Sequence, residues 1–488
     1  MAQASTNAPT TFEELKDILS DDDKVQASAE RLIYDVAGVD VDGILRGKIM
    51  TKEKFLSACK AGGFGFCSVV FGWDMHDQAY PNELKISNLE NGYRDLNARI
   101  DFNTYRRTPT EPSLPFFLVT FLEPDTGDTL SACPRGTLQR IIAELEASGF
   151  EAYAGAEYEY FQFRETPDSV AAKDFHNLQP LTSGMHGYSL LRPELNSEYF
   201  HALYDNCAKF GIPLEGHHTE TGPGVFESAL AYQSVLRMAD NATLFKWVAK
   251  TTGYKFGVMP TFMAKPYSNQ PGCSGHVHIS LRDAKTGKNI FAVDEADLKT
   301  GRSDALYDDT KRISKIAEHF LAGVLKGLPD IMPCLLPNVN GYKRLVESYW
   351  APVNVSYAYE SRVASVRIIS PPLADPAATR LEVRVPGADM NPYLTFAAVI
   401  ACGLQGIKQS LPLTLKPLKT IQGQKPKLER LPKTLQEATI KMANKDSVAR
   451  QVLGDEFVDH FVGTRQHEWN LFASAVTDWE LKRYLELA

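Results

Sequence analysis

Charged side chains recur two residues apart inside apolar segments at three distant places in the chain. The segments are AGAEYEYFQF at 154–163, GCSGHVHISL at 272–281 and ATRLEVRVPG at 378–387. Aromatic and β-branched neighbours favour strands, in which residues i and i+2 point to the same face. A charged strand face is costly to bury unless opposite charges compensate it. The three segments therefore predict strands whose charged faces meet ions, partner charges or solvent.

Two of these segments carry pairs of candidate metal ligands. Glu157 and Glu159 repel each other on one strand face unless a cation lies between them, and a solvent-facing edge strand is the alternative. His276 and His278 share a face after a Gly-rich turn, which favours a functional pair. Zinc is one use of such a pair, but no third His or Cys follows at a suggestive distance.

A fourth polar segment is EGHHTETGPGVFESAL at 215–230. Its TGPG turn would fold the chain back so that the carboxylates of Glu220 and Glu227 converge. The alternative is helix capping by Glu227 or Thr221, because the following residues are interpreted as a helix. The turn is no phosphate-binding loop, since GxxxxGK[ST] occurs nowhere in the chain.

Arginines concentrate between residues 344 and 384 within apolar strand-like sequence. They are Arg344, Arg362, Arg367, Arg380 and Arg384. A ladder of Arg/Glu salt bridges on a sheet face would explain them. Binding of phosphate or carboxylate is the sharper hypothesis, because the guanidinium fork matches both groups.

Taken together, these residues combine strand- or turn-borne carboxylates, one or two histidines and an arginine cluster. Ligand sets rich in carboxylates with a single His suit Mg²⁺ or Mn²⁺ rather than zinc or copper. An arginine cluster beside such a set is typical of phosphoryl transfer from a nucleotide, where metals and arginines neutralise the moving charge.

Composition narrows the class of protein. The 488 residues carry a net charge of −8 without a Lys/Arg block, which argues against nucleic acid or an anionic membrane as the partner. Seven scattered cysteines without a CxxC pair predict reduced thiols in a cytoplasmic protein. The first residues lack the features of a secretory signal. The apolar segment 393–407 is too short to span a bilayer and is expected to form a buried helix.

The chain is expected to contain at least two domains. Residues 1–29 are predicted to form a polar tail and a short helix. Residues 30–134 show short strands with turns, at 31–38, 42–50, 66–72 and 116–130, and 81–112 is interpreted as a long connection without periodicity. Residues 135–488 alternate longer helices with strands, beginning with a helix that stops near Gly149.

The order of the motifs resembles the glutamine synthetase superfamily, in its type I-like branch. The motifs are E-x-E, H-H-x-E…E, G-x-S-G-H-x-H-x-S, N-x-x-x-Y-K-R-L, S-R…R and R-x-E-V-R-x-P. The resemblance extends from about residue 30 to the end. It implies an α+β fold, with an N-terminal β-grasp domain followed by an α/β catalytic domain. It also implies ring-shaped homo-oligomers, dodecamers or decamers, whose active sites lie between neighbouring subunits.

Carried over by position, the resemblance implies a role for each motif residue. Glu159, Glu220 and Glu227 would form one metal site, and Glu157, His276 and Glu382 another, for about two to three Mg²⁺ or Mn²⁺ ions. Gly272 and Arg344 would contact the substrate amino acid. Arg362 and Arg367 would face the phosphates, Arg384 the γ-carboxylate, and His278 and Ser280 the nucleotide. Asp74, with Asp77 as the fallback, would be offered to the neighbouring subunit's site.

Three positions depart from the family pattern, and all three lie at the amine and amino-acid end. A glutamate normally precedes the Ala-Pro of the Arg-bearing loop, whereas this chain has Trp350. An indole is no base, but its face suits an alkyl or aromatic amine or an ammonium group. Val225 replaces a glutamine and Pro271 an asparagine.

The resemblance therefore predicts an ATP-dependent ligase that phosphorylates the γ-carboxylate of glutamate and lets an amine displace the phosphate. A γ-glutamylamine or γ-glutamylpolyamine synthetase is favoured over a true glutamine synthetase that uses ammonia. A catalytically silent structural or sensory homologue is the third hypothesis.

Overall fold

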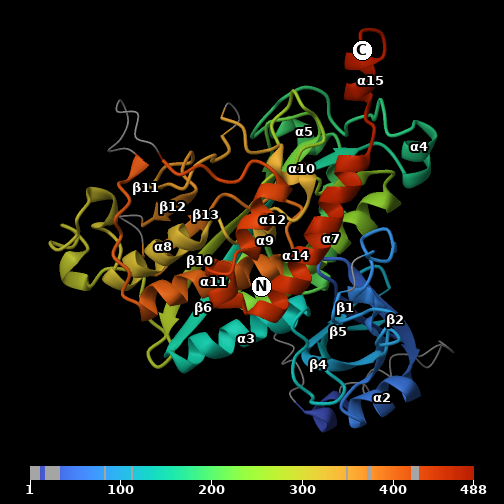
Figure 1. Ribbon diagram of the computed structural model, residues 1–488, viewed down its shortest axis with the longest axis horizontal. Coiled ribbons are helices and arrows are strands. Elements are labelled where there is room, and N and C mark those ends of the chain that lie inside the picture. The colour runs from blue at the N-terminus through green and yellow to red at the C-terminus, as the bar shows by residue number, and fades with distance from the viewer. Residues whose placement is uncertain are drawn as a thin grey trace.

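Two β-sheets organise the chain (Figure 1). The structure is a computed structural model that describes residues 11–16, 33–81, 84–111, 114–347, 350–370, 375–418 and 428–488. One sheet has five strands in the order β2-β1-β5-β4-β3. The other has eight, in the order β11-β12-β13-β10-β6-β8-β7, with β9 paired to β6. Most of the predicted tail at 1–29 lies outside the described residues.

The five-stranded sheet is built within residues 33–122. Its strands are β1 (Ile33–Val39), β2 (Leu45–Thr51), β3 (Phe64–Cys67), β4 (Asp95–Arg107) and β5 (Pro115–Leu122), and α2 (Lys52–Lys60) follows β2. All eight residues of β5 are buried, because PFFLVTFL is apolar at nearly every position. β1 pairs antiparallel with β2 and parallel with β5.

Two predictions for this sheet were wrong in detail. The strand expected over 66–72 ends at Cys67 and continues as a 3-10 turn, Ser68–Phe71. The connection expected over 81–112 contains β4, the longest strand of this sheet. Its sequence, DLNARIDFNTYRR, buries Leu96, Ala98 and Ile100 and leaves polar residues between them. The polar half of this alternation hides the strand from a search for apolar runs.

The eight-stranded sheet carries the charged segments. Its strands are β6 (Phe150–Phe163), β7 (Leu214–Thr219), β8 (Val225–Ser234), β9 (Met259–Thr261), β10 (Gly275–Asp283), β11 (Tyr357–Tyr359), β12 (Val366–Ile369) and β13 (Arg380–Val383). The three segments predicted as strands are confirmed as β6, β10 and β13. Their register sets His276 opposite Glu157 and sets Glu382 opposite both His278 and Arg367.

The helix predicted directly after the TGPG turn begins later than expected. Residues Val225–Ser234 form β8, and α7 (Val235–Lys255) begins only afterwards. In VFESALAYQS, buried Phe226, Ser228 and Leu230 alternate with less buried residues. The same letters also fit a helical period, so the pattern alone does not separate the two.

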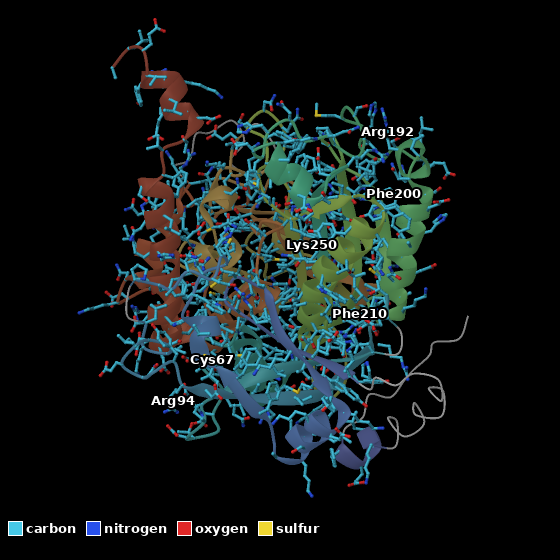
Figure 2. The ribbon with its side chains drawn as sticks, turned by 90° about the vertical axis from the view of Figure 1, so that its right-hand side faces the viewer. Cys67, Arg94, Arg192, Phe200, Phe210 and Lys250 are labelled. Carbon is cyan, nitrogen blue, oxygen red and sulfur yellow. The ribbon has the colours of Figure 1, made fainter. Side chains whose placement is uncertain are left out.

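Helices pack against this sheet and against one another. They are α3 (Pro134–Ala147), α4 (Pro167–Ala172), α5 (Leu191–Glu194), α6 (Ser197–Lys209), α7, α8 (Lys315–Gly327), α9 (Met332–Leu335), α10 (Val339–Tyr342), α11 (Pro392–Lys408), α12 (Leu435–Ala443), α13 (Val448–Leu453), α14 (Asp455–Ser474) and α15 (Asp478–Tyr484). α3 and α7 pack on β6. α11 is the predicted buried helix. In both views α15 projects from the rest of the chain (Figures 1 and 2). Among the described residues, no helix is long and apolar enough to cross a membrane.

Buried ion pairs join the region of the five-stranded sheet to the helices. Arg135 of α3 contacts Asp101 of β4 at 2.8 Å and Asp240 of α7 at 3.0 Å. Arg465 of α14 contacts Asp42, in the β1–β2 turn, at 2.6 Å. Because removal of one partner would leave a buried charge uncompensated, these pairs hold the two regions in one arrangement.

Candidate active site

Three strands bring a first group of candidate metal ligands together. Nδ1 of His276 lies 3.6 Å from Glu157 Oε2 and 3.7 Å from Glu382 Oε1. One ligand atom from each of the three residues lies within 4.8 Å of the other two. We call Glu157, His276 and Glu382 the strand cluster. The sequence predicted this set, and the strand register places its members side by side.

Arginines surround the most buried carboxylate of the strand cluster. Glu382 is 1% exposed; Arg367 contacts it at 3.1 Å and Arg384 also pairs with it. Burial alone would raise the pKa of Glu382, but His276 and then Arg384 outweigh it and lower the pKa. The pKa of Glu157 is likewise lowered, because the imidazoles of His276 and His278, at 3.6 Å and 3.0 Å from its oxygens, outweigh its burial. Both carboxyls are therefore held ionised, as metal ligands must be.

A second group lies on the hairpin that β7 and β8 form. His218 Nε2 lies 3.5 Å from Glu227 Oε1, and Glu220 completes the group within 4.8 Å. We call His218, Glu220 and Glu227 the hairpin cluster. The hydrogen bond to Glu227 raises the pKa of His218 to about 9. His218 was missed from the sequence, although it stands opposite Glu227 across the hairpin.

Glu159 was expected to belong to this second group. In the structure it lies beside the hairpin cluster rather than within it. Its Oε2 accepts a hydrogen bond of 2.6 Å from the backbone N–H of Ser274. Its pKa is raised by burial and further by Glu227 and Glu220, whereas His276 lowers it. In the register of β6 and β8, Glu159 stands directly opposite Glu227, so it lies beside the hairpin cluster. A divalent cation would relieve the repulsion among the three glutamates.

The donor chemistry of both clusters fits hard divalent cations. Each offers two carboxylates and one imidazole, and no Cys belongs to either. Oxygen-rich sets of this kind suit Mg²⁺ or Mn²⁺. The residues present therefore fit the metals that the sequence predicted.

Gly272 and Arg344 are packed directly against each other. A Cβ on Gly272 would lie 2.5 Å from Arg344 Cγ and 2.6 Å from the carbonyl oxygen of Ala264, so only glycine fits. The buried Arg344 guanidinium donates to Ser274 Oγ at 3.0 Å and to the carbonyl of Pro386 at 3.0 Å. Arg344 Nε is buried without a hydrogen-bond partner among the described residues.

His278 and Ser280 line a cavity of about 270 Å³ beside the strand cluster. The Ser280 hydroxyl lies 2.8 Å from the hydroxyl of Tyr232, and Arg380 Nε donates to His278 Nδ1 at 3.1 Å. Tyr232, which also lines the cavity, was missed as a site residue, whereas Arg380, another lining residue, was named among the arginines expected to bind phosphate or carboxylate. Tyr232 was hidden because its strand was interpreted as a helix.

Arg362 and Trp350 lie toward the surface. Arg362 is exposed, and its carbonyl accepts a hydrogen bond of 2.9 Å from Arg384 Nε. Trp350 is 73% exposed at a φ of 58°, a conformation that bulky residues rarely adopt. It lines a second cavity of about 450 Å³, whose other apolar residues are Ala351, Val353, Val363, Leu418 and Leu428.

The two aspartates expected at a subunit interface are held within their own chain. Asp74 Oδ2 lies 3.1 Å from His467 Nε2, and its Oδ1 accepts from the N–H groups of His76 and Gln78. Asp77 pairs with Arg46 at 2.7 Å. The His467 contact fixes the loop that carries Asp74 onto α14.

Comparison with known proteins gives a consistent family. The family described as "Glutamine synthetase, catalytic domain" matches residues 131–484. "Type-1 glutamine synthetase 2" of Dictyostelium discoideum is 44% identical over 455 residues, covering 93% of this chain and 83% of the relative. A glutamate–isopropylamine ligase of a Pseudomonas species is 32% identical, covering 93% and 94%. A gamma-glutamylethanolamide synthetase of Streptomyces coelicolor is 30% identical, covering 92% and 91%.

Among solved structures, a GmaS–ADP complex superposes with a TM-score of 0.76. It is 23% identical, and the superposition covers 95% of this chain and 99% of that one. This likeness concerns the fold, a mixed arrangement of helices and sheets.

Proposed function

This chain belongs to the glutamine synthetase family, and from that premise we propose that it is an ATP-dependent ligase that joins the γ-carboxylate of glutamate to an organic amine. The observation that carries the choice of amine is Trp350, which stands where the family pattern has a glutamate and lines a mostly apolar cavity that also contains Glu347, Asn354 and Ser356. The reaction belongs to nitrogen metabolism.

In the first step, a γ-carboxylate oxygen of glutamate bonds to the γ-phosphorus of ATP, and ADP leaves. Bound divalent cations supply charge neutralisation for this transfer. Arg384 orients the γ-carboxylate, and Arg362 and Arg367 stabilise the negative charge on the transferred phosphoryl group. His278, Ser280 and Tyr232 hold the nucleotide, while Gly272 and Arg344 hold the amino-acid end.

In the second step, the amine nitrogen bonds to the carbonyl carbon of the γ-glutamyl phosphate, the bond from that carbon to the phosphate oxygen breaks so that phosphate leaves, and the amine loses a proton. Trp350 cannot accept this proton. Asp74 from a neighbouring subunit, with Asp77 as the fallback, is the proposed acidic residue at this end of the site.

The cavity that Trp350 lines adjoins the groups proposed to act on the γ-carboxylate. Val363 in its wall directly follows Arg362, whose carbonyl holds Arg384. An alkyl or aryl substituent of the amine fits between Val353, Val363 and the indole, while ammonia would leave this apolar space empty. The isopropylamine and ethanolamide relatives support an organic acceptor.

Glutamine synthesis from ammonia is the second candidate, because the relative named a type-1 glutamine synthetase is 44% identical. A catalytically silent homologue is disfavoured, because both clusters and all the predicted arginines are retained.

The test is phosphate release from ATP by the purified protein with Mg²⁺ and glutamate. Ammonia, methylamine, isopropylamine, ethanolamine and putrescine are supplied separately. We expect at least one organic amine to exceed ammonia in kcat/KM by tenfold or more. Trp350→Glu should shift that ratio at least tenfold toward ammonia, whereas Tyr254→Glu, which adds the same charge on the exposed end of α7, should not. Turnover with ammonia alone would establish glutamine synthesis instead.

We also infer that residues 30–134 form a β-grasp domain and residues 135–488 the catalytic domain. The separate five-stranded sheet with α2 against it supports this division. A ring-shaped homo-oligomer, a dodecamer or a decamer, is proposed from the family. Native mass spectrometry tests the number of subunits, and a monomer would contradict the assembly.

A further inference from the structure

A third cavity, of about 420 Å³, lies on the other side of the eight-stranded sheet. The β1–β2 turn forms one wall, with Leu45, and α7 forms another, with Lys246, Trp247 and Lys250. Figure 2 labels Lys250 on α7, above the strands of the five-stranded sheet. The cavity therefore lies where the two sheet regions meet.

This cavity is separate from the proposed active site. Tyr158, between Glu157 and Glu159 on β6, points to the opposite face of its strand from those two residues. There its ring lies against Phe245 of α7, and Lys246 Nζ lies 4.9 Å from the ring centroid. Lys246 thus lies behind the strand whose front carries the proposed metal ligands.

Two lysines of α7 line this cavity, and the described carboxylates compensate their charge only in part. Lys246 and Lys250 stand one turn apart on α7, and neither forms an ion pair with a described carboxylate. Lys246 Nζ donates to the carbonyl of Met390 at 2.7 Å. Burial, only partly offset by Asp389, lowers the pKa of Lys246 to about 7. Like charges at i and i+4 repel, so an anion between them would stabilise both.

The other charged groups of the cavity each have at least one partner, although Asp389 Oδ1 is buried without a hydrogen bond among the described residues. Arg465 pairs with Asp42 at 2.6 Å, and Asp389 Oδ2 accepts a hydrogen bond of 2.7 Å from Asn338. The rest of the lining is largely apolar, with Trp247, Phe262, Met75 and Met263 among it. The lining therefore combines two lysines with an aromatic and thioether surface, and Lys246 Nζ lies 5.5 Å from the centroid of the Phe262 ring.

We propose that this cavity binds a small organic carboxylate, with its charged end between Lys246 and Lys250 and its apolar body against Trp247 and Phe262. A carboxylate is favoured over inorganic phosphate for two reasons. Phosphate has no apolar body to cover the aromatic wall, and its second negative charge would meet Asp42 and Asp389 in the same cavity. The site needs neither ATP, metal nor amine.

Isothermal titration of the full-length protein with phenylacetate tests this site. ATP and metal are left out, and glutamate is kept saturating so that the proposed amino-acid site is filled. We expect phenylacetate to bind once per chain. Lys246→Met and Lys250→Gln should each weaken binding at least tenfold, while the matched control Lys255→Gln, on the exposed end of α7, should leave it unchanged.

Three outcomes would overturn the proposal: no phenylacetate binding to the wild-type protein, equal binding by the Lys250→Gln protein, or lysine-dependent binding of phosphate alone. Lys250 is exposed, so its substitution tests the site even if Lys246→Met disturbs folding. Because no turnover is measured, failure here is distinguishable from failure of the ligase assignment, and an inactive protein that binds phenylacetate would still support the site.

Discussion

The strand cluster and the hairpin cluster offer the same donors, two carboxylates and one imidazole, but are held differently. Glu157, His276 and Glu382 come from three strands in the middle of a sheet, and arginines already compensate the most buried carboxylate. His218, Glu220 and Glu227 come from one hairpin and the turn that closes it, and no described arginine pairs with them.

The two clusters therefore differ both in how firmly the backbone holds them and in which side chains compensate their charge. The strand cluster has its geometry set by backbone pairing on both sides of β10. The hairpin cluster depends on a TGPG turn and on the histidine that neutralises Glu227. We therefore expect damage to the first to unfold or inactivate the protein, and damage to the second mainly to weaken metal binding.

The largest effect is expected from Glu382→Gln. It leaves Arg367, Arg384 and His276 without their shared counter-charge in a buried place, which costs about 3–5 kcal/mol of stability, and it removes a proposed ligand. Urea unfolding and phosphate release measure the two losses, and activity should fall below detection. The matched control is Glu360→Gln, which removes only an outer partner of Arg367 and should cost under ~1 kcal/mol. Equal losses of stability in the two proteins would mean that Glu382 does not compensate the buried charges of Arg367, Arg384 and His276.

An intermediate effect is expected from His218→Asn in the hairpin cluster. Loss of one ligand should weaken Mn²⁺ binding about 10–100-fold, with little change in stability. Glu159→Gln should weaken it less, because one oxygen of Glu159 is engaged by the N–H of Ser274. Free Mn²⁺ measured by electron paramagnetic resonance gives both affinities. A larger loss of Mn²⁺ affinity in the Glu159→Gln protein would instead support the metal site predicted from the sequence, in which Glu159 joins Glu220 and Glu227.

The smallest effect, a local one, is expected from acid. Burial, with a further contribution from His218, lowers the pKa of His217 to about 3, and its ring packs against Phe200 and Phe226. The unfolded chain binds a proton near pH 6.5 and the folded chain only near pH 3, so stability falls as pH drops through this window. Hydrogen exchange should rise in Leu214–Thr219 before it rises in Gly275–Asp283. His217→Phe should remove part of the difference, and simultaneous loss in both strands would contradict the comparison.

The strand cluster could be predicted from the sequence because its residues alternate within apolar segments. The period of two puts Glu157 and Glu159, or His276 and His278, on one face whatever the partners are. The motif order then indicates which strands meet. Register is a long-range property, so the pairing of His218 with Glu227 across the hairpin, and the turning of Glu159 toward Ser274, were not predictable from either segment alone.

Other features carried no readable signal. β4 and β8 mix polar and apolar residues, and each was assigned to the wrong element. The cavity lined by Lys246 and Lys250 combines residues as far apart in the sequence as Leu45 and Phe262, and no sequence motif describes this set. Such a site depends on how two sheet regions pack, which is decided by buried pairs such as Arg465 with Asp42 rather than by local propensity.

One strand, β6, sets the spacing of the whole proposed reaction centre. It carries Glu157 into one cluster and Glu159 to the edge of the other, and a strand advances ~6.8 Å over two residues. The separation between the cation positions is therefore a property of the backbone, independent of the amine. Substitutions around Trp350, on a loop outside the sheet, would change what enters the proposed acceptor cavity without altering that separation. A family built on this strand can diversify its acceptors while phosphoryl transfer stays the same.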